Sequence, residues 1–223
     1  MKFKLDREAI AMRVARELRD GQYVNLGLGI GTLASSYIPE GETIVFHAEN
    51  GVVGFGRVLG DEDAEQRDIN LANPGGQYVA PLPGMSFSSM CSAFGMVRGG
   101  HVDVTVLGAL QVSEKGDLAN WTVPGERVPV IGGAMDMAVG AKKVIIATPH
   151  TSGGGKPKIV KECTYPLTAK RCVNLIITDV AVIEVTDEGL LLKEYCPGWT
   201  VEEIQGITEP KLRVSEELKE MAL

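Results

Sequence analysis

The feature of this sequence that most limits its possible folds is a series of short apolar segments. They cover residues 102–109, 143–148, 175–185 and 190–195, are rich in Val, Ile and Leu, and mostly end at Gly, Pro or Asp. Apolar runs of this length are typical of strands buried on both faces, as in parallel sheets covered by helices. We therefore expect an α/β fold, a three-layer open sheet that is mostly parallel, in a single domain over residues 1–223.

The first apolar residues follow a helical period instead. Ile10, Val14 and Leu18 lie four residues apart, which predicts an amphipathic helix that ends at Gly21. The other elements that we expect are strands over residues 23–29 and 43–49, a short helix over 33–37, a helix that begins at Thr200 with Glu203 as its capping-box partner, and a last helix over 216–221 capped by Ser215.

Charge and cysteine content exclude several functional classes. The chain has 22 basic and 29 acidic residues, a net charge of −7, whereas nucleic-acid binding usually requires a basic face. The four cysteines form no C-x-x-C pair, and the three histidines show no metal-ligand spacing. No apolar run reaches the roughly 18 residues of a membrane span, and the N-terminus lacks the apolar core of a signal peptide. We expect a cytoplasmic protein with no metal site, no nucleic-acid partner and no membrane segment.

An acidic residue ends the second expected strand, in the run Phe46-His47-Ala48-Glu49-Asn50-Gly51. In open α/β sheets the carboxyl ends of the strands line the ligand crevice. A carboxylate there is ionised at pH 7 and can act as a nucleophile without a general base. The alternative is a simple Asn-Gly turn with an exposed acid.

Two glycine-rich turns are candidate anion sites. The run Gly27-Leu28-Gly29-Ile30-Gly31 follows an expected strand, and its backbone N–H groups could face an anion, or its glycines could only permit a tight turn. Thr32 replaces the third glycine of the dinucleotide fingerprint. After the apolar run 128–131, Gly132-Gly133 could direct two N–H groups at an oxyanion, or form a loop before a helix that packs Met135, Met137 and Val139.

The segment 142–171 is locally basic. It holds seven basic residues and one acidic residue, a net charge of +6 in an acidic chain. A patch of this kind could bind a polyphosphate such as the ADP end of a cofactor, contact a partner protein, or simply be solvated.

Together these segments closely resemble the B (β) subunit of the 3-oxoacid class of coenzyme A transferases. The resemblance runs from about Ile10 to the C-terminus. The motifs that carry it are Asn25-Leu26-Gly27-Leu28-Gly29, the run from Phe46 to Gly51, Arg98-Gly99-Gly100-His101-Val102-Asp103, Gly116-Asp117-Leu118-Ala119-Asn120-Trp121, Gly132-Gly133-Ala134-Met135-Asp136 and Cys163-Thr164-Tyr165-Pro166-Leu167-Thr168.

The resemblance implies roles for particular residues. Glu49 matches the family's nucleophilic glutamate, which forms a glutamyl-CoA thioester, and Gly133 with Ala134 matches its oxyanion hole. It implies no tightly bound cofactor, with coenzyme A as a substrate. It also implies an obligate A (α) subunit in an α2β2 heterotetramer, with the active site between the two kinds of chain. The residues that it places near the substrate or CoA are Gly27, Gly29, Asn50, Gly51, Asn73, Gly75 and Gly76.

Three departures from the family pattern concern substrate choice. Ala48 stands where Ser is usual, Gly31 where Pro is usual, and Gly76 where some members carry Lys. The function that we expect is CoA transfer between a short-chain 3-oxoacyl-CoA, such as acetoacetyl-CoA in butyrate metabolism, and a carboxylic acid. The alternatives are the B (β) subunit of a 3-oxoadipate:succinyl-CoA transferase, a non-catalytic ligand sensor, and a sugar-phosphate isomerase, because these proteins share the fold.

Overall fold

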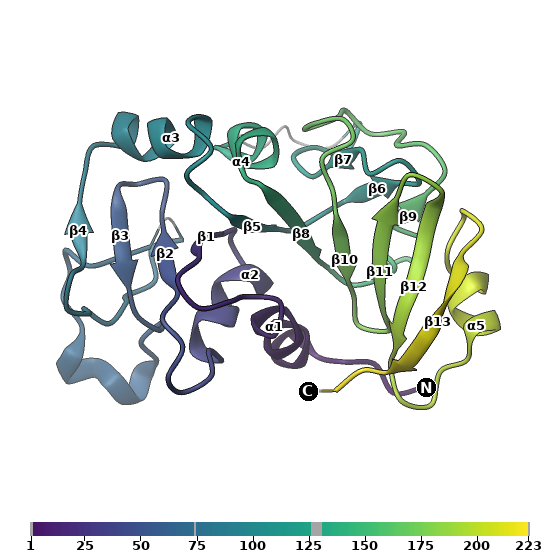
Figure 1. Ribbon diagram of the computed structural model, residues 1–223, viewed down its shortest axis with the longest axis horizontal. Coiled ribbons are helices and arrows are strands. Elements are labelled where there is room, and N and C mark those ends of the chain that lie inside the picture. Colours follow the sequence, from purple (N-terminus) through teal and green to yellow (C-terminus); the bar gives the residue numbers. More distant parts are fainter. Residues whose placement is uncertain (1, 74, 126–130, 223) are drawn as a thin grey trace.

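The computed structural model describes residues 2–73, 75–125 and 131–222. Within them the chain forms a ten-stranded sheet, in the order β13-β12-β11-β10-β8-β5-β1-β2-β3-β4, and a small sheet in the order β7-β6-β9 (Figure 1). The strands are β1 Tyr23–Leu26, β2 Val45–His47, β3 Val52–Phe55, β4 Ser86–Phe87, β5 Val104–Leu107, β6 Gln111–Ser113, β7 Leu118–Ala119, β8 Lys143–Ala147, β9 Ile159–Val160, β10 Leu175–Ile177, β11 Ala181–Thr186, β12 Gly189–Tyr195 and β13 Arg213–Glu220.

The centre of the large sheet is parallel, as expected. Strands β10, β8, β5, β1 and β2 pair in parallel, and antiparallel pairs extend this centre on both sides. Every residue of β5 and β10 is buried, which explains why these segments are continuously apolar. The α/β, mostly parallel fold is therefore confirmed.

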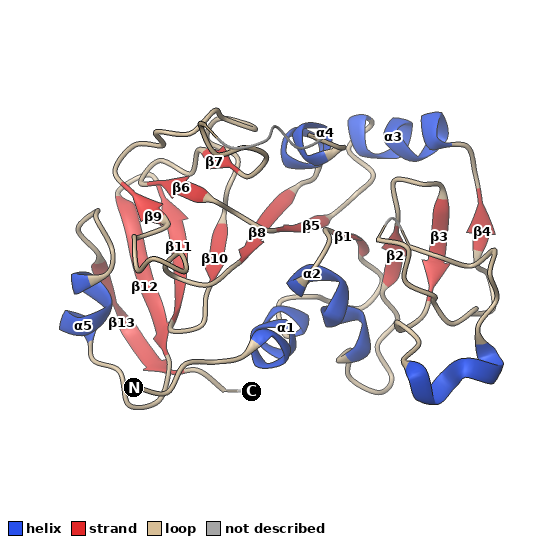
Figure 2. Cartoon of the chain, turned by 180° about the vertical axis from the view of Figure 1, so that it is seen from behind, coloured by secondary structure: helices blue, strands red, loops and turns tan. Residues whose placement is uncertain are grey.

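Helices cover both faces of this sheet and give three layers (Figure 2). Helix α1 and the short α2 lie on one face, while α3 and α4 lie on the other (Figure 1). The helical elements are α1 Arg7–Ala15, α2 Ile30–Leu33, α3 Met90–Arg98, α4 Ala134–Gly140, α5 Val201–Gly206 and the 3-10 helices η1 Ala34–Ser36 and η2 Asp61–Gln66. None of the helices in the described ranges is long and apolar enough to span a membrane.

Helix α1 is amphipathic, but it ends earlier than predicted. The Asp6 side chain caps its first turn by accepting from the Ala9 N–H at 2.8 Å, and Ile10 and Val14 are buried. The last helical residue is Ala15, so Leu18, although buried, belongs to the turn that follows.

Several predicted strands are shorter or divided. Residues 175–185 form two antiparallel strands, β10 and β11, because Thr178 turns the chain between them. Its hydroxyl oxygen accepts from the Ala181 N–H at 2.9 Å. Strand β2 ends at His47, so Glu49 lies beyond the strand rather than within it.

The predicted last helix over 216–221 is wrong. Residues 216–220 belong to strand β13, which pairs in parallel with β12 at the edge of the large sheet, and Ser215 lies inside the strand rather than at a helix cap. The Glu- and Lys-rich composition favours a helix, but the backbone pairing with β12 decides the structure. The preceding helix is confirmed, since Thr200 and Glu203 form the expected capping box of α5.

Candidate active site

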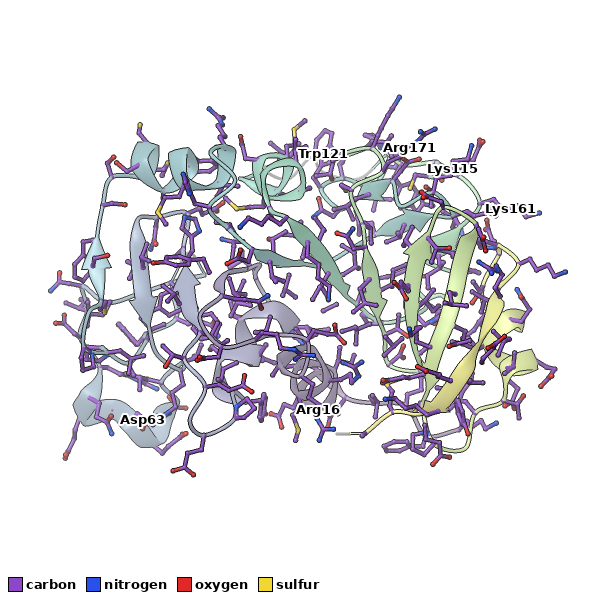
Figure 3. All side chains as sticks on the ribbon, in the orientation of Figure 1. Arg16, Asp63, Lys115, Trp121, Lys161 and Arg171 are labelled. Carbon is purple, nitrogen blue, oxygen red and sulfur yellow. The ribbon has the colours of Figure 1, made fainter. Side chains whose placement is uncertain are left out.

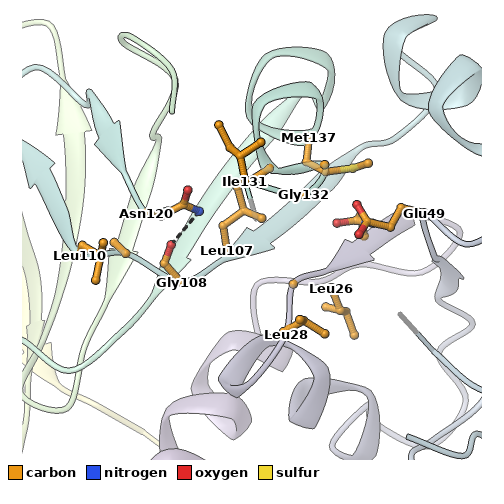
Figure 4. Close-up of a pocket in the computed structure, with 15 residues that line it drawn as sticks. Leu26, Leu28, Glu49, Leu107, Gly108, Leu110, Asn120, Ile131, Gly132 and Met137 are labelled. Atoms are coloured by element: carbon orange, nitrogen blue, oxygen red, sulfur yellow. Dashed lines mark hydrogen bonds between the residues drawn. The ribbon is translucent and has the colours of Figure 1, made fainter. Parts of the chain in front are cut away.

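A pocket of about 370 Å³ opens at the carboxyl ends of β1, β2 and β5 (Figure 4). This is the edge where open parallel sheets bind ligands. Its apolar wall is formed by Leu26, Leu28, Leu107, Leu110, Ile131 and Met137. The only polar side chains among the described residues that line it belong to Asn25, Glu49 and Asn120.

The turn after β2 directs Glu49 into this pocket. The Gly51 N–H donates to the Ala48 carbonyl at 3.0 Å and closes the turn. Gly51 has a φ of +103°, and a Cβ there would overlap the Ser88 carbonyl, so only glycine fits. The Asn50 side chain donates to the Ala72 carbonyl at 2.8 Å. Asn50 and Gly51 thus shape the turn, and neither lines the pocket.

Gly133 lies directly beside the carboxylate of half-buried Glu49. Burial is the main cause that raises the pKa of Glu49 above its ordinary value, and the nearby Asp136 raises it further, while the Gly133 N–H works in the opposite direction. The nucleophile candidate is therefore more basic than a solvated glutamate, and one backbone donor already contacts it.

A side chain at position 133 would displace Glu49. A Cβ there would overlap the Glu49 carboxylate and would lie 2.9 Å from Cζ of Phe94. Ala134 begins helix α4 and also lines the pocket. The structure thus brings Glu49, Gly133 and Ala134 together from distant parts of the sequence. The apolar run expected before this turn has residues 128–130 outside the described ranges, and of the three side chains expected to pack, Met137 is buried while Met135 and Val139 are exposed.

A buried hydrogen-bond network, absent from the sequence interpretation, supports the strand ends below Glu49. The His47 Nε2 lies 3.0 Å from the Ala93 carbonyl, and because a carbonyl only accepts, Nε2 carries the proton. Nδ1 of His47 then accepts from Nδ2 of Asn25 at 3.3 Å, and the Oδ1 atom of Asn25 accepts from the Thr105 hydroxyl at 3.1 Å. Burial lowers the pKa of His47, so the network is neutral and ties β1, β2, β5 and α3 together.

In the glycine turn after β1, the backbone of Gly27 lies very close to strand β5. The Gly27 N–H donates to the Val106 carbonyl at 2.7 Å, and a Cβ on Gly27 would lie 2.7 Å from the same oxygen. This N–H is therefore not available to an anion, although Gly27 lines the Glu49 pocket. Gly29 lines a neighbouring pocket with Gly75, and Leu28 contributes to both pockets.

The loop after residue 72 is held by an internal turn. The buried Asn73 accepts through Oδ1 from the N–H groups of Gly75 at 2.9 Å and Gln77 at 3.1 Å. Neither Asn73 nor Gly76 lines the Glu49 pocket or its neighbour.

The basic segment does not form one continuous patch. Lys142 pairs with Asp103 at 2.7 Å, and Lys143 pairs with Glu17 at 2.8 Å. Lys158 donates to the Ala109 carbonyl at 2.9 Å, and burial lowers its pKa. Lys161 and Arg171 lie beside the small sheet at one end of the molecule (Figure 3).

Comparison with known proteins gives a family model and similar relatives. Residues 7–206 match the model described as Coenzyme A transferase. The chain is 47% identical over 208 residues to the B subunit of the 3-oxoadipate CoA-transferase of Acinetobacter baylyi, covering 92% of this chain and 94% of that protein. It is 42% identical over 212 residues to the beta subunit of the acetate CoA-transferase of Escherichia coli strain K12, covering 95% of each.

A solved structure shows the same fold. The acyl-CoA transferase apoenzyme of Escherichia coli O157:H7 superposes with a TM-score of 0.75 at 23% identity, covering 99% of this chain and 45% of that chain. The present chain thus spans less than half of that larger protein.

Proposed function

This chain belongs to the coenzyme A transferase family, and from that premise we propose that it is the β subunit of an enzyme that moves CoA between acetoacetyl-CoA, or a similar short-chain 3-oxoacyl-CoA, and a carboxylic acid. The observation that carries the proposal is the Glu49 carboxylate, which faces an apolar pocket and lies directly beside the Gly133 backbone. None of the ion pairs among the described residues involves Glu49, so a structural salt bridge does not account for an acid at this place.

The chemistry begins with attack of Glu49 on the thioester carbonyl. A carboxylate oxygen bonds to the acyl carbon, the C–S bond breaks, and CoA leaves as a thiolate, which gives a glutamyl anhydride. The thiolate then attacks the glutamyl carbonyl and releases the first acid as a carboxylate, leaving a glutamyl-CoA thioester. A second acid takes the CoA by the reverse steps, so the kinetics are ping-pong.

Gly133 has a role at the step in which the thiolate attacks. A glutamyl oxygen beside the Gly133 N–H becomes an oxyanion as the thiolate attacks, and a backbone donor close to it before the reaction stabilises that charge. Ala134 lies next to it at the start of α4 and is the second donor that we propose.

The active site of the proposed enzyme includes a second chain. We propose that this partner is an A (α) subunit, that the assembly is α2β2, and that the Glu49 pocket lies between the two kinds of chain. The relatives support a partner, because their names are those of subunits and the chain covers nearly their whole length. The four cysteines are free thiols, which fits the cytoplasmic location that we propose.

The second candidate is transfer from 3-oxoadipyl-CoA, favoured by the relative that is 47% identical. Its acyl group ends in a second carboxylate, which a cation would recognise. No Lys or Arg occurs among the described residues that line the pocket, and the wall is rich in Leu. This lining favours the uncharged acetoacetyl group.

Intact-mass spectrometry of the complex, in which this chain is coexpressed with its α partner, tests the proposal. With acetoacetyl-CoA and no acceptor acid, we expect a CoA-sized adduct on this chain that is absent in Glu49→Gln. Assembly of the Glu49→Gln complex, checked by gel filtration, serves as the control. A competent complex that gives no adduct with several acyl-CoAs would reject covalent transfer, and unchanged ligand binding in Glu49→Gln would then favour the sensor.

A further inference from the structure

The three polar side chains that line the Glu49 pocket among the described residues differ in how many of their hydrogen-bonding groups are still unpaired. Glu49 is the proposed nucleophile. Asn25 is fully engaged, because Nδ2 donates to the His47 carbonyl at 3.2 Å and contacts His47 Nδ1, while Oδ1 accepts from Thr105. Asn120 is the remaining polar side chain among the described lining residues, and it lies across the pocket from Glu49 (Figure 4).

The orientation of the Asn120 amide is fixed by two neighbours. Its Nδ2 lies 3.2 Å from the Gly108 carbonyl, which can only accept, so the nitrogen must face that side. Its Oδ1 accepts from the buried Thr168 hydroxyl at 2.6 Å, and that hydroxyl also accepts from the Asn120 N–H at 3.1 Å. A rotated amide would place its oxygen against the Gly108 carbonyl oxygen, two acceptors that cannot form a hydrogen bond with each other.

One hydrogen of the amide is therefore unused. An amide nitrogen carries two hydrogens, and Gly108 takes one of them. No described residue accepts the second hydrogen of Asn120 Nδ2. The Asn120 side chain lines the pocket. Asn120 thus presents a neutral donor on a wall that is otherwise mostly apolar.

We propose that Asn120 is a specificity-determining residue that donates this second hydrogen to the 3-oxo oxygen of the acyl group. The inference rests on the proposed function. The 3-oxo oxygen is bonded to C3 of the acyl group, and the reacting carbonyl carbon is C1. When C1 lies at Glu49 and Gly133, we expect the 3-oxo oxygen to extend toward the opposite wall of the pocket. A neutral amide suits a ketone oxygen, and the leucines around it suit the terminal methyl group.

This arrangement selects 3-oxoacyl groups over acyl groups without the oxygen. An analogue that lacks the acceptor leaves this pocket-lining donor without a partner, which is a stronger source of rejection than a missing methylene. Butyryl-CoA is the matched analogue of acetoacetyl-CoA, because it has the same four carbons and lacks only the 3-oxo group.

The test compares acetoacetyl-CoA with butyryl-CoA as donors to the coexpressed complex, in wild type, Asn120→Leu and Asn120→Asp. Leu removes the donor at similar volume. Asp also removes it but keeps the acceptor for Thr168, so it serves if the Leu variant does not fold. In both variants we expect kcat/KM for acetoacetyl-CoA to fall about tenfold or more, with butyryl-CoA within about threefold of wild type.

Two results would overturn the inference. Equal losses with both donors would make Asn120 a structural residue that holds the Gly108 carbonyl, and unchanged kcat/KM with both donors would remove it from substrate recognition. A wild-type complex that transfers CoA from neither donor and forms no Glu49 adduct would instead reject the proposed function. That failure is visible before any Asn120 variant is made.

Discussion

Glu49 and Gly133 show how single residues set the reactivity of the site. Burial makes the carboxylate more basic, and the nearby Asp136 adds to this effect, whereas one backbone N–H limits it. In the proposed mechanism, the same N–H would stabilise the oxyanion that forms when the thiolate attacks the glutamyl carbonyl. Small changes at three positions should therefore alter the rate without altering the fold.

Gly133→Ala should remove most of the activity. The new Cβ would overlap the Glu49 carboxylate and crowd the Phe94 ring, so the donor and the nucleophile separate. Loss of one oxyanion donor typically lowers kcat about 100- to 1,000-fold. Stopped-flow measurement of CoA adduct formation checks the loss, with urea unfolding as the control for folding. Near-normal adduct formation would show that the close approach at 133 is not required.

Asp136→Asn should move the acid limb of the pH profile to lower pH. Asp136 raises the pKa of Glu49, so its neutralisation lowers that pKa and keeps the nucleophile ionised in more acidic solution. The variant also loses the ion pair with exposed Arg98, an interaction of little stability value. Arg98→Gln is the matched control, because it breaks the same pair and leaves the carboxylate. An acid limb that stays in place in Asp136→Asn would contradict the coupling.

The sequence indicates some of these residues and not others, for physical reasons. An acid after an apolar strand points to Glu49, and paired glycines before a helix point to Gly133. Their contact could not be derived from spacing, because the two turns come from separate segments that the sheet brings together. Asn120 could not be recognised as a donor, since an amide gains direction only from neighbours such as Gly108 and Thr168.

At the scale of elements, the sequence predicts strand existence better than strand ends. The buried centre of the sheet follows from its apolar runs, because burial on both faces selects Val, Ile and Leu. Strand β13 was missed because its alternation is weak at an exposed edge, where only backbone pairing with β12 holds it. The turn at Thr178 was missed because a hydroxyl inside an apolar run gives no periodic signal.

Asn73→Ala should lower the stability of the protein, through the loop that Asn73 holds, but should leave its catalytic activity nearly unchanged. The buried Oδ1 of Asn73 satisfies two backbone N–H groups, so its loss should lower the free energy of unfolding by about 1–3 kcal/mol. Because Asn73 does not line the Glu49 pocket, adduct formation at saturating acetoacetyl-CoA should stay within about twofold of wild type. Urea unfolding and intact-mass kinetics measure the two effects. Wild-type stability with a large rise in KM for CoA would instead support direct CoA binding at this residue.

At the scale of the whole molecule, a buried histidine should couple stability to pH. His150 has no exposed surface, lies between the hydroxyls of Thr178 and Thr208, and has a pKa lowered to about 4, mainly by burial. The fold therefore favours the neutral form, while the unfolded chain takes up a proton near its ordinary pKa of about 6.5. Stability from this group is fully present above pH 6.5 and is lost as the pH falls toward 4.

His150→Gln isolates this effect, because an amide can bond both hydroxyls without titrating. Between pH 7.5 and pH 4, wild type should lose on the order of 3 kcal/mol more unfolding free energy than the variant. Urea titrations at several pH values measure the difference, in which the other titrating groups cancel. Parallel pH curves for the two proteins would contradict the assignment.

The edge strand β13 has a consequence for how the chain behaves while it is alone. An open sheet edge is a template on which another chain can add a strand, the first step toward aggregation. The eight residues of β13 include Arg213, Glu216, Glu217, Lys219 and Glu220, and most of them face solvent. Any strand added there would crowd charge against charge, so this edge should resist fibril growth and favour solubility during synthesis.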